Sequence, residues 1–183
     1  MNTEETKKIT LSLIDTFNKA SQKALDLRKL GLIKKIKSDN TPVSNADIEV
    51  NNILTDKIKE ITPNIKIVSE ESSDHKKDND LKNFWLIDPI DGTRDYISNR
   101  DEFTLNAALI LDKKPVIGII TAPAKKRIFY SYGLSNSYEL TDGCEISLID
   151  KKKKYKGLTS VSYSNQLKPE ILEIHKKYKI TSH

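Results

Sequence analysis

The chain has 183 residues, 37% hydrophobic and 31% charged, which describes a soluble globular protein of one domain or slightly more. Its net charge of +5 modestly favours anionic ligands and says nothing about the fold. No apolar stretch is long enough to cross a bilayer, and the polar, acidic N-terminus is unlike a signal peptide. A cytoplasmic protein is therefore expected, with peripheral association with the inner membrane left open.

Two further features exclude other classes of protein. The single cysteine, Cys144, rules out a disulfide framework and a cysteine-based metal site, and it is expected to be buried or incidental. The basic block from Lys151 to Lys154 has neither an aromatic-rich strand nor an arginine-bearing helix beside it. We interpret the block as a solvated loop and expect no nucleic-acid polymer among the partners.

Apolar residues recur at helical spacing near the start of the chain and at strand-like spacing through most of the remainder. The first helix is expected over residues 4–28, and a second runs from the N-cap Ser44 to about Ile61. Strands are expected at 32–37, 65–69, 84–87, 103–111, 116–121, 127–132, 137–140 and 158–162. One or two helical turns follow Gly92, and a last helix spans Pro169 to Tyr178. This order predicts an α+β fold with two N-terminal helices packed on a mainly antiparallel sheet.

Acidic residues recur at the boundaries of these elements. Asp47 lies near the start of the second helix. Glu70 and Glu71 end one strand, and Asp88 and Asp91 end another. If the two strands are neighbours, the carboxylates converge at one edge of the sheet and repel one another unless cations lie between them. Oxygen ligands without histidine or cysteine select Mg²⁺, Mn²⁺ or Ca²⁺ over zinc.

Taken singly, each acid has a simpler explanation. D-P-x-D-G is more often a turn than a metal site, and a pair such as Glu70-Glu71 is usually solvated. Asp47 alone could be a helix N-terminal acid favoured by the helix dipole. Only their joint occurrence, each beside a structural boundary, points to a metal centre.

The segment D-P-I-D-G-T at 88–93 has the chemistry that such a centre needs. Pro89 restricts the backbone so that Asp88 and Asp91 can point the same way. The carbonyl oxygen of Ile90, between them, can then serve as a further ligand.

The last two residues of this segment suit a phosphate group. Gly92 would allow close approach of an anion, and the amides of Gly92 and Thr93 would form an anion site if they open a helix. The hydroxyl of Thr93 could orient an attacking water. Together with the acids, these groups suggest hydrolysis of a phosphate ester assisted by two or more Mg²⁺ ions.

Three motifs together resemble those of the inositol-monophosphatase superfamily, whose members are Mg²⁺-dependent, Li⁺-sensitive phosphatases. The motifs are T-P-V-S-N-A-D at 41–47, V-S-E-E-S at 68–72 and D-P-I-D-G-T at 88–93. The residues after the third motif, Arg94-Asp95-Tyr96, resemble the 3'(2'),5'-bisphosphate nucleotidase branch, the CysQ type, whereas inositol monophosphatases tend towards T-N-F. The segments at 102–110 and 118–123 resemble the next two strands of that branch.

The resemblance implies a role for each motif residue. The metal ligands would be Glu70, Asp88 bridging two ions, the carbonyl of Ile90, and Asp91. Asp47 would hydrogen-bond Thr93, and the pair would orient and deprotonate the nucleophilic water. Gly92 and Thr93 would bind the scissile phosphate. Glu71 is expected beside the ligands, and Lys37 at a loop that closes over the site. The implied cofactor is Mg²⁺, as two or three ions, with Mn²⁺ as an alternative.

The family's second signature, W-D-x-A-A, does not occur, because the only tryptophan is Trp85. The resemblance therefore implies a sugar-phosphatase-like fold that lacks most of its C-terminal α/β half. We expect an N-terminal α+β phosphatase domain at 1–160 and the start of a truncated C-terminal domain at 161–183. Because the second half supplies another metal-binding aspartate in the family, a separate C-terminal half or a homodimer is left open as a partner.

The implied function is hydrolysis of the 3'-phosphate of a small anionic nucleotide by a metal-activated water. The expected substrates are adenosine 3',5'-bisphosphate (PAP) and 3'-phosphoadenosine 5'-phosphosulfate (PAPS). Two other interpretations stay open: an inositol or sugar monophosphatase, and a truncated domain that binds metal or phosphate with impaired catalysis.

Overall fold

A computed structural model describes residues 1–36, 42–71, 81–149, 159–160 and 181–182. The chain forms two compact units, residues 1–149 and residues 150–183. Of the second unit, the structure describes two short strands, β10 (Thr159–Ser160) and β11 (Thr181–Ser182), which pair in parallel.

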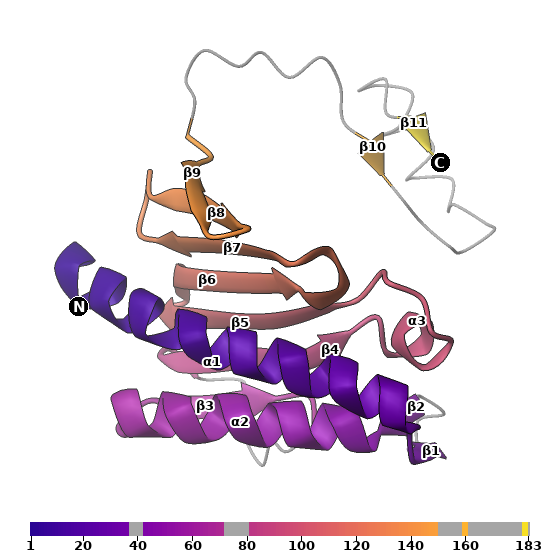
Figure 1. The fold of residues 1–183 in the computed structure, drawn as a ribbon. Helices are drawn as coiled ribbons and strands as arrows, with labels where there is room; N and C mark the ends of the chain where they lie inside the picture. Colours follow the sequence, from indigo (N-terminus) through magenta and orange to yellow (C-terminus); the bar gives the residue numbers. More distant parts are fainter. Residues whose placement is uncertain (37–41, 72–80, 150–158, 161–180, 183) are drawn as a thin grey trace. The chain divides into compact units, whose positions relative to one another are not determined.

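The first unit begins with two long helices that lie side by side over one face of a sheet (Figure 1). α1 (Thr3–Leu30) starts with a capping box: the Asn2 side chain accepts from the backbone N–H of Glu5, and the Glu5 carboxylate accepts from the N–H of Asn2. α2 (Asn45–Ile61) is capped by Ser44. Both helices lie where the sequence predicts them, and α1 is one residue longer at its start and two at its end.

The sheet of the first unit has seven strands in the order β3-β4-β5-β6-β7-β8-β9. β3 and β4 are parallel, and every other neighbouring pair is antiparallel. The strands are β3 (Lys66–Ser69), β4 (Phe84–Asp91), β5 (Thr104–Leu111), β6 (Lys114–Ala122), β7 (Arg127–Tyr132), β8 (Ser137–Thr141) and β9 (Cys144–Ser147). The predicted α+β class, with two helices packed on a mainly antiparallel sheet, is confirmed.

Two of these strands differ from the prediction. β4 continues past Ile87 as far as Asp91, so the D-P-I-D segment belongs to the strand, and its pairing with β5 shifts register between Asp88 and Asp91. β9 was not predicted, because its four residues are all exposed and leave no apolar alternation to detect. Cys144, at the start of β9, is exposed, so of the two expectations for this residue burial is wrong and an incidental cysteine remains.

Short elements complete the first unit. β1 (Lys34–Ile36) pairs antiparallel with β2 (Pro42–Ser44). α3 (Thr93–Ile97) is the single helical turn expected after Gly92, and η1 (Pro123–Lys125) follows β6. The Lys151–Lys154 block and the helix expected at 169–178 lie outside the described residues.

The core lies between the two long helices and the sheet. Side chains from α1, α2, β4 and β5 meet there with no exposed surface, among them Phe17, Leu54, Trp85 and Leu105. Burying one such side chain contributes about 1.5–3 kcal/mol to stability. The Trp85 indole donates to the Thr62 hydroxyl at 3.0 Å, so its one polar atom is paired.

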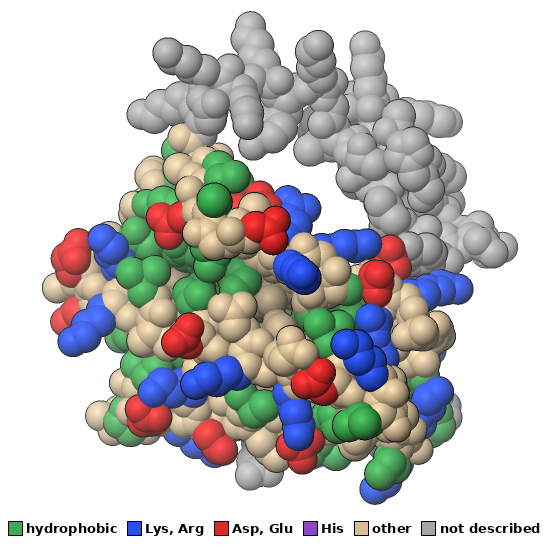
Figure 2. Space-filling model, viewed as in Figure 1, with side chains coloured by type: hydrophobic (Ala, Val, Ile, Leu, Met, Phe, Trp, Pro, Cys, Tyr) green, Lys and Arg blue, Asp and Glu red, His purple; other side chains and the backbone are tan. Residues whose placement is uncertain are grey.

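The surface over the two helices carries mixed charge. Figure 2 shows Lys and Arg side chains interspersed with Asp and Glu over α1 and α2. On this face the net charge is therefore not gathered into a basic patch of the kind that binds nucleic acid. Of the helices that the structure describes, none has the length and apolarity needed to span a membrane.

Candidate active site

The parallel pairing of β3 with β4 brings the acidic residues together. Ser69 is opposite Ile87 in this pair, and the N–H of Glu70 donates to the carbonyl of Ile87 at 3.1 Å. Glu70 and Asp88 therefore both come directly after the last residue pair that joins β3 to β4, although β4 itself continues to Asp91. The adjacency on which the predicted convergence depends is present.

Asp47 reaches the same place from the first turn of α2. Its side chain is 1% exposed, and its Oδ2 accepts from the backbone N–H and the hydroxyl of Ser44, both at 2.7 Å. Its Oδ1 accepts from the hydroxyl of Thr93 at 3.3 Å. The capping box fixes the carboxylate and aims its second oxygen at the turn after β4.

The hydroxyl of Thr93 has two acceptors for one hydrogen. It lies 2.9 Å from the carbonyl of Ile90 and 3.3 Å from Asp47 Oδ1. The shorter distance favours the carbonyl, so the contact with Asp47 is the weaker of the two in this structure. The Ile90 side chain is buried in the core, which fixes the position of its carbonyl.

Asp88 is the electrostatic centre of the cluster. Its pKa is raised to about 7. Burial is the largest cause, followed by the negative charges of Glu70 and Asp91, a hydrogen bond with Glu70 and the charge of Asp47. Its Oδ1 is buried and has no hydrogen-bond partner among the described residues. A buried carboxylate in this state needs either a proton or a cation to compensate its charge.

Asp91 is held by a residue that the sequence did not single out. The amide of Asn106 on β5 donates from Nδ2 to Asp91 Oδ2 at 3.2 Å. Asn106 is the register partner of Asp88, and the register shift in β4 lets it also reach Asp91. Its Oδ1 is buried and unpaired within the described part of the chain. The only signal in the sequence was a polar residue on the same face of β5 as Thr104 and Ala108.

The conformation and packing of the backbone at position 92 require a glycine, whether or not an anion binds there. Its φ of 87° lies in the left-handed region, and a Cβ there would lie 2.8 Å from the carbonyl oxygen of Glu102 and 3.3 Å from Cα of Phe103. The space beside this glycine is filled by the 102–103 backbone. α3 has only five residues, so an anion at its start would depend on individual amides and not on a helix dipole.

Two residues expected near the ligands have different outcomes. The backbone N–H of Glu71 donates to the Ser69 hydroxyl at 3.3 Å, and Ser69 in turn donates to Asn51 Oδ1 at 2.6 Å. This chain of contacts ties the end of β3 to α2. Lys37 lies outside the described residues.

The donor set fits a hard divalent cation. Glu70, Asp88, Asp91 and the Ile90 carbonyl offer oxygen atoms only, and the buried, unpaired Oδ1 of Asp88 is the clearest single sign of a missing positive partner. Within the described ranges, no three His, Cys, Asp or Glu side chains already form a ready-made metal-binding group. The carboxylates would therefore have to reorient to share one ion.

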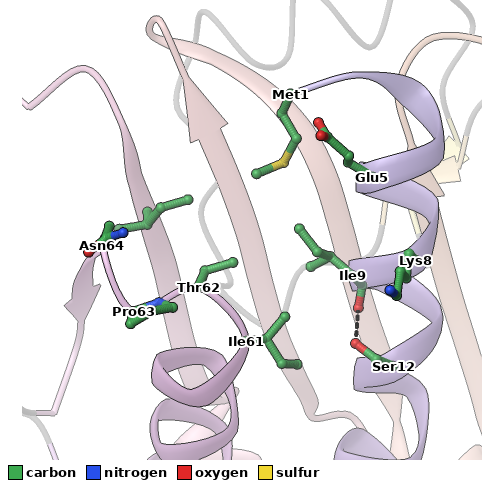
Figure 3. A pocket seen from close by; sticks show the side chains of 10 residues that line it. Met1, Glu5, Lys8, Ile9, Ser12, Ile61, Thr62, Pro63 and Asn64 are labelled. Atoms are coloured by element: carbon green, nitrogen blue, oxygen red, sulfur yellow. Dashed lines mark hydrogen bonds between the residues drawn. The ribbon is translucent and has the colours of Figure 1, made fainter.

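A cleft of about 340 Å³ opens beside the acids. It is lined by Asp91, Gly92, Asp101, Glu102, Phe103, Thr104, Ala122 and Lys125. A larger pocket of about 630 Å³ lies between the first turns of α1 and the end of α2, where Met1, Ile9 and Ile61 point into it (Figure 3). Because Asp47 lies in the first turn of α2 and Ile61 ends the helix, about 20 Å of helix separates this pocket from the acids. Of these two cavities, the smaller cleft is the one next to the acidic residues of the candidate active site.

Comparison with known proteins agrees with this geometry. A model of the inositol monophosphatase family matches residues 2–182. The chain belongs to the inositol monophosphatase family.

Within this family, the similarity extends to proteins of the CysQ branch, as the motifs predict. The 3'(2'),5'-bisphosphate nucleotidase CysQ of Aggregatibacter actinomycetemcomitans is 36% identical over 116 residues, which are 62% of this chain and 43% of that protein. The chain thus spans less than half the length of this curated relative.

Solved structures of the family share the fold. The crystal structure of CysQ from Bacteroides thetaiotaomicron has a TM-score of 0.65 and 24% identity, covering 94% of this chain and 70% of that one. An IMPase/NADP phosphatase complexed with Mg²⁺ and phosphate has a TM-score of 0.71 and 13% identity, covering 99% of this chain and 67% of that one.

Proposed function

We propose that this chain carries the metal-binding half of a phosphatase that hydrolyses the 3'-phosphate of PAP or PAPS. The observation that carries the proposal is the convergence of Glu70, Asp88 and Asp91 around a buried carboxylate oxygen without a partner. Similarity to CysQ nucleotidases supports the choice of a nucleotide substrate.

In this proposal the acids hold divalent cations. Glu70, Asp88, Asp91 and the carbonyl of Ile90 would bind two or three Mg²⁺ ions, with Mn²⁺ as the alternative. Bound ions would lower the pKa of a coordinated water and stabilise the leaving oxygen of the ester. A solved relative of the same fold contains Mg²⁺ and phosphate, which supports the choice of metal.

The pair Asp47 and Thr93 would orient the attacking water and accept its proton. With its carbonyl oxygen committed to a cation, Ile90 would be a poorer acceptor for the Thr93 hydroxyl, so the hydroxyl would donate to Asp47 instead. Thr93 Oγ1 would then be free to accept a hydrogen bond from the water. The Ser44 contacts at 2.7 Å would hold the Asp47 carboxylate in place during this transfer.

The remaining groups would bind the substrate. The amides of Gly92 and Thr93 would contact the scissile phosphate, and the cleft beside Asp91 would accommodate the leaving nucleotide. Glu71 would support the ligands from the adjacent position, and Lys37 would act from its loop. The proposal includes an N-terminal domain at residues 1–160 and the start of a second domain at 161–183. The partner would be a separate C-terminal half or a second copy of the chain, and the location would be the cytoplasm.

Phosphate release by the purified chain tests the proposal. We expect Mg²⁺-dependent release from PAP, abolished by EDTA and by Asp88→Asn, and much slower release from inositol 1-phosphate. Faster release from inositol 1-phosphate would favour the inositol or sugar monophosphatase instead. If neither substrate is hydrolysed but Mg²⁺ with phosphate raises the melting temperature, only a binding domain with impaired catalysis remains.

A further inference from the structure

The last turn of α1 is tied to the segment that supports Gly92. We infer that Arg28 is a positioning residue for the phosphate-binding turn, because it clamps residues 100–103 against the end of this helix. The role of Arg28 in phosphate binding rests on the proposed function, whereas the attachment of residues 100–103 to α1 rests on contacts within the structure alone.

The guanidinium of Arg28 makes two hydrogen bonds to the clamped segment. Nη1 donates to the carbonyl of Arg100 at 2.6 Å, and Nη2 donates to Asp101 Oδ1 at 3.0 Å. The Arg28 side chain is only 13% exposed, so this ion pair is shielded from solvent on the arginine side. An ion pair of this kind holds its partners more firmly than one between two exposed side chains.

Two aromatic rings also contact the guanidinium of Arg28. Its central carbon lies 5.8 Å from the centre of the Tyr96 ring and 5.1 Å from that of Phe103. The two rings meet edge to face with their centres 4.8 Å apart. Tyr96 also donates its hydroxyl to the carbonyl of Ala24 at 2.7 Å, one turn before Arg28 on α1. Helix α1 therefore holds both α3 and the 100–103 segment.

The backbone of the clamped segment is in direct contact with Gly92. A Cβ on Gly92 would be 2.8 Å from the Glu102 carbonyl oxygen and 3.3 Å from Phe103 Cα, so the two backbones are already in close contact. Gly92 also accepts a hydrogen bond from the N–H of Tyr96 at 3.0 Å. If residues 102–103 move outward, the constraint on the backbone of Gly92 and Thr93 is lost. Even a displacement of about 1 Å at a group that binds substrate lowers the rate of catalysis strongly.

A lysine could not replace this arginine. The clamp uses two donors in a planar fork beside two aromatic rings, whereas the compact ammonium of a lysine cannot reach both acceptors in the same fixed geometry. A lysine at this position would keep the attraction to the Asp101 carboxylate but lose the hydrogen bond to the carbonyl of Arg100. We therefore expect Arg28→Lys to behave more like Arg28→Gln than like the wild type.

Arg127 offers a matched control on the same unit. Its Nε donates to Glu139 at 2.5 Å, and its guanidinium carbon lies 4.7 Å from the centre of the Phe129 ring. Arg127→Gln therefore removes the same kinds of interaction from β7, among strands that do not contact Gly92. Any loss common to both variants reflects general stability.

Two measurements test the clamp without requiring turnover. The first is tryptic cleavage of the Arg100–Asp101 bond, followed by mass spectrometry, which we expect to be about tenfold faster in Arg28→Gln and Arg28→Lys. The second is the affinity for inorganic phosphate in the presence of Mg²⁺, from the concentration dependence of the melting temperature. We expect the apparent dissociation constant to rise about tenfold, with the response to Mg²⁺ alone unchanged.

The outcomes separate the clamp from the proposed function. Wild-type cleavage rates in both Arg28 variants, or equal changes in Arg127→Gln, would overturn the clamp. Faster cleavage with unaltered phosphate affinity would overturn the positioning role. If the wild type hydrolyses no phosphate ester, the proposed function fails, whereas the cleavage and phosphate measurements still decide the role of Arg28.

Discussion

The hydroxyl of Thr93 lies 3.3 Å from Asp47 Oδ1, although the two residues are 46 positions apart in the sequence. The other oxygen of the same carboxylate closes the capping box of α2 with Ser44. One side chain thus begins a helix and contacts the turn after β4. Helix stability and the proposed acceptance of a proton therefore depend on the same residue.

Asp47→Asn should separate these two roles. The amide can still accept one hydrogen bond but carries no charge, so we expect phosphate release to fall about 100-fold or more, with a stability loss of about 1 kcal/mol. Phosphate release and the melting temperature are measured together. Asn2→Ala, which removes the matching cap of α1, is the control and should cost similar stability at unchanged activity. Equal losses of activity in both variants would mean that Asp47 acts through stability alone.

Asp88→Asn should stabilise the metal-free protein at alkaline pH. Because the pKa of Asp88 is raised from 3.8 to about 7, the folded state binds this proton more tightly than the unfolded chain does. The contribution of Asp88 to stability therefore falls as the pH rises from 3.8 to about 7, and the full cost is present above that range.

In EDTA at pH 8, we expect Asp88→Asn to be about 1–2 kcal/mol more stable than the wild type, and the difference to vanish near pH 4. Chemical denaturation at both pH values measures the difference. Asp15→Asn, at an exposed acid on α1, is the control and should show little change. A gain that does not depend on pH would contradict the electrostatic explanation.

Gly92→Ala should destabilise the protein more than an alanine at another left-handed glycine. Gly92 combines a φ of 87° with a position where a Cβ would meet the Glu102 carbonyl oxygen at 2.8 Å. Gly143 has a φ of 78° but nothing within 4 Å of the added atom. We expect a loss of about 1 kcal/mol for Gly143→Ala and about 2–4 kcal/mol for Gly92→Ala, measured by denaturant unfolding. Similar losses would show that strain, and not the contact with 102–103, sets the cost.

Asn106→Leu should weaken the response to Mg²⁺. Without the amide of Asn106, Asp91 loses the group that orients its carboxylate, and residues that orient metal ligands typically contribute about 10–100-fold to affinity. The Mg²⁺ concentration that gives half of the maximal rise in melting temperature should increase about tenfold. Asn83→Ala is the control, since Asn83 accepts a hydrogen bond from Asp112 before the opposite end of β4. An unchanged Mg²⁺ response in Asn106→Leu would exclude this role.

Local features of the chain were predictable because they depend on neighbours in sequence. The caps of both helices come from residues three apart, and the single turn after Gly92 follows from a glycine at a strand end. The acids were predictable for the same reason, since each lies beside a boundary that the sequence predicts, even though β4 in fact continues past Asp88 to Asp91. β9 was missed because an exposed, four-residue strand has no periodic apolar pattern.

Contacts between distant segments were decided by the tertiary structure. The sequence predicted Glu70 and Asp88 at the ends of two strands, but only the parallel pairing of β3 with β4 makes the two residues adjacent. Asn106 reaches Asp91 because of a register shift, and Arg28 reaches residues 100–103 because α1 crosses the sheet at that end. Such contacts depend on how helices and strands pack, which local spacing does not encode. The sequence by itself therefore determined which groups could bind metal and phosphate, and the packing of β3, β4 and the two helices decided which of them meet.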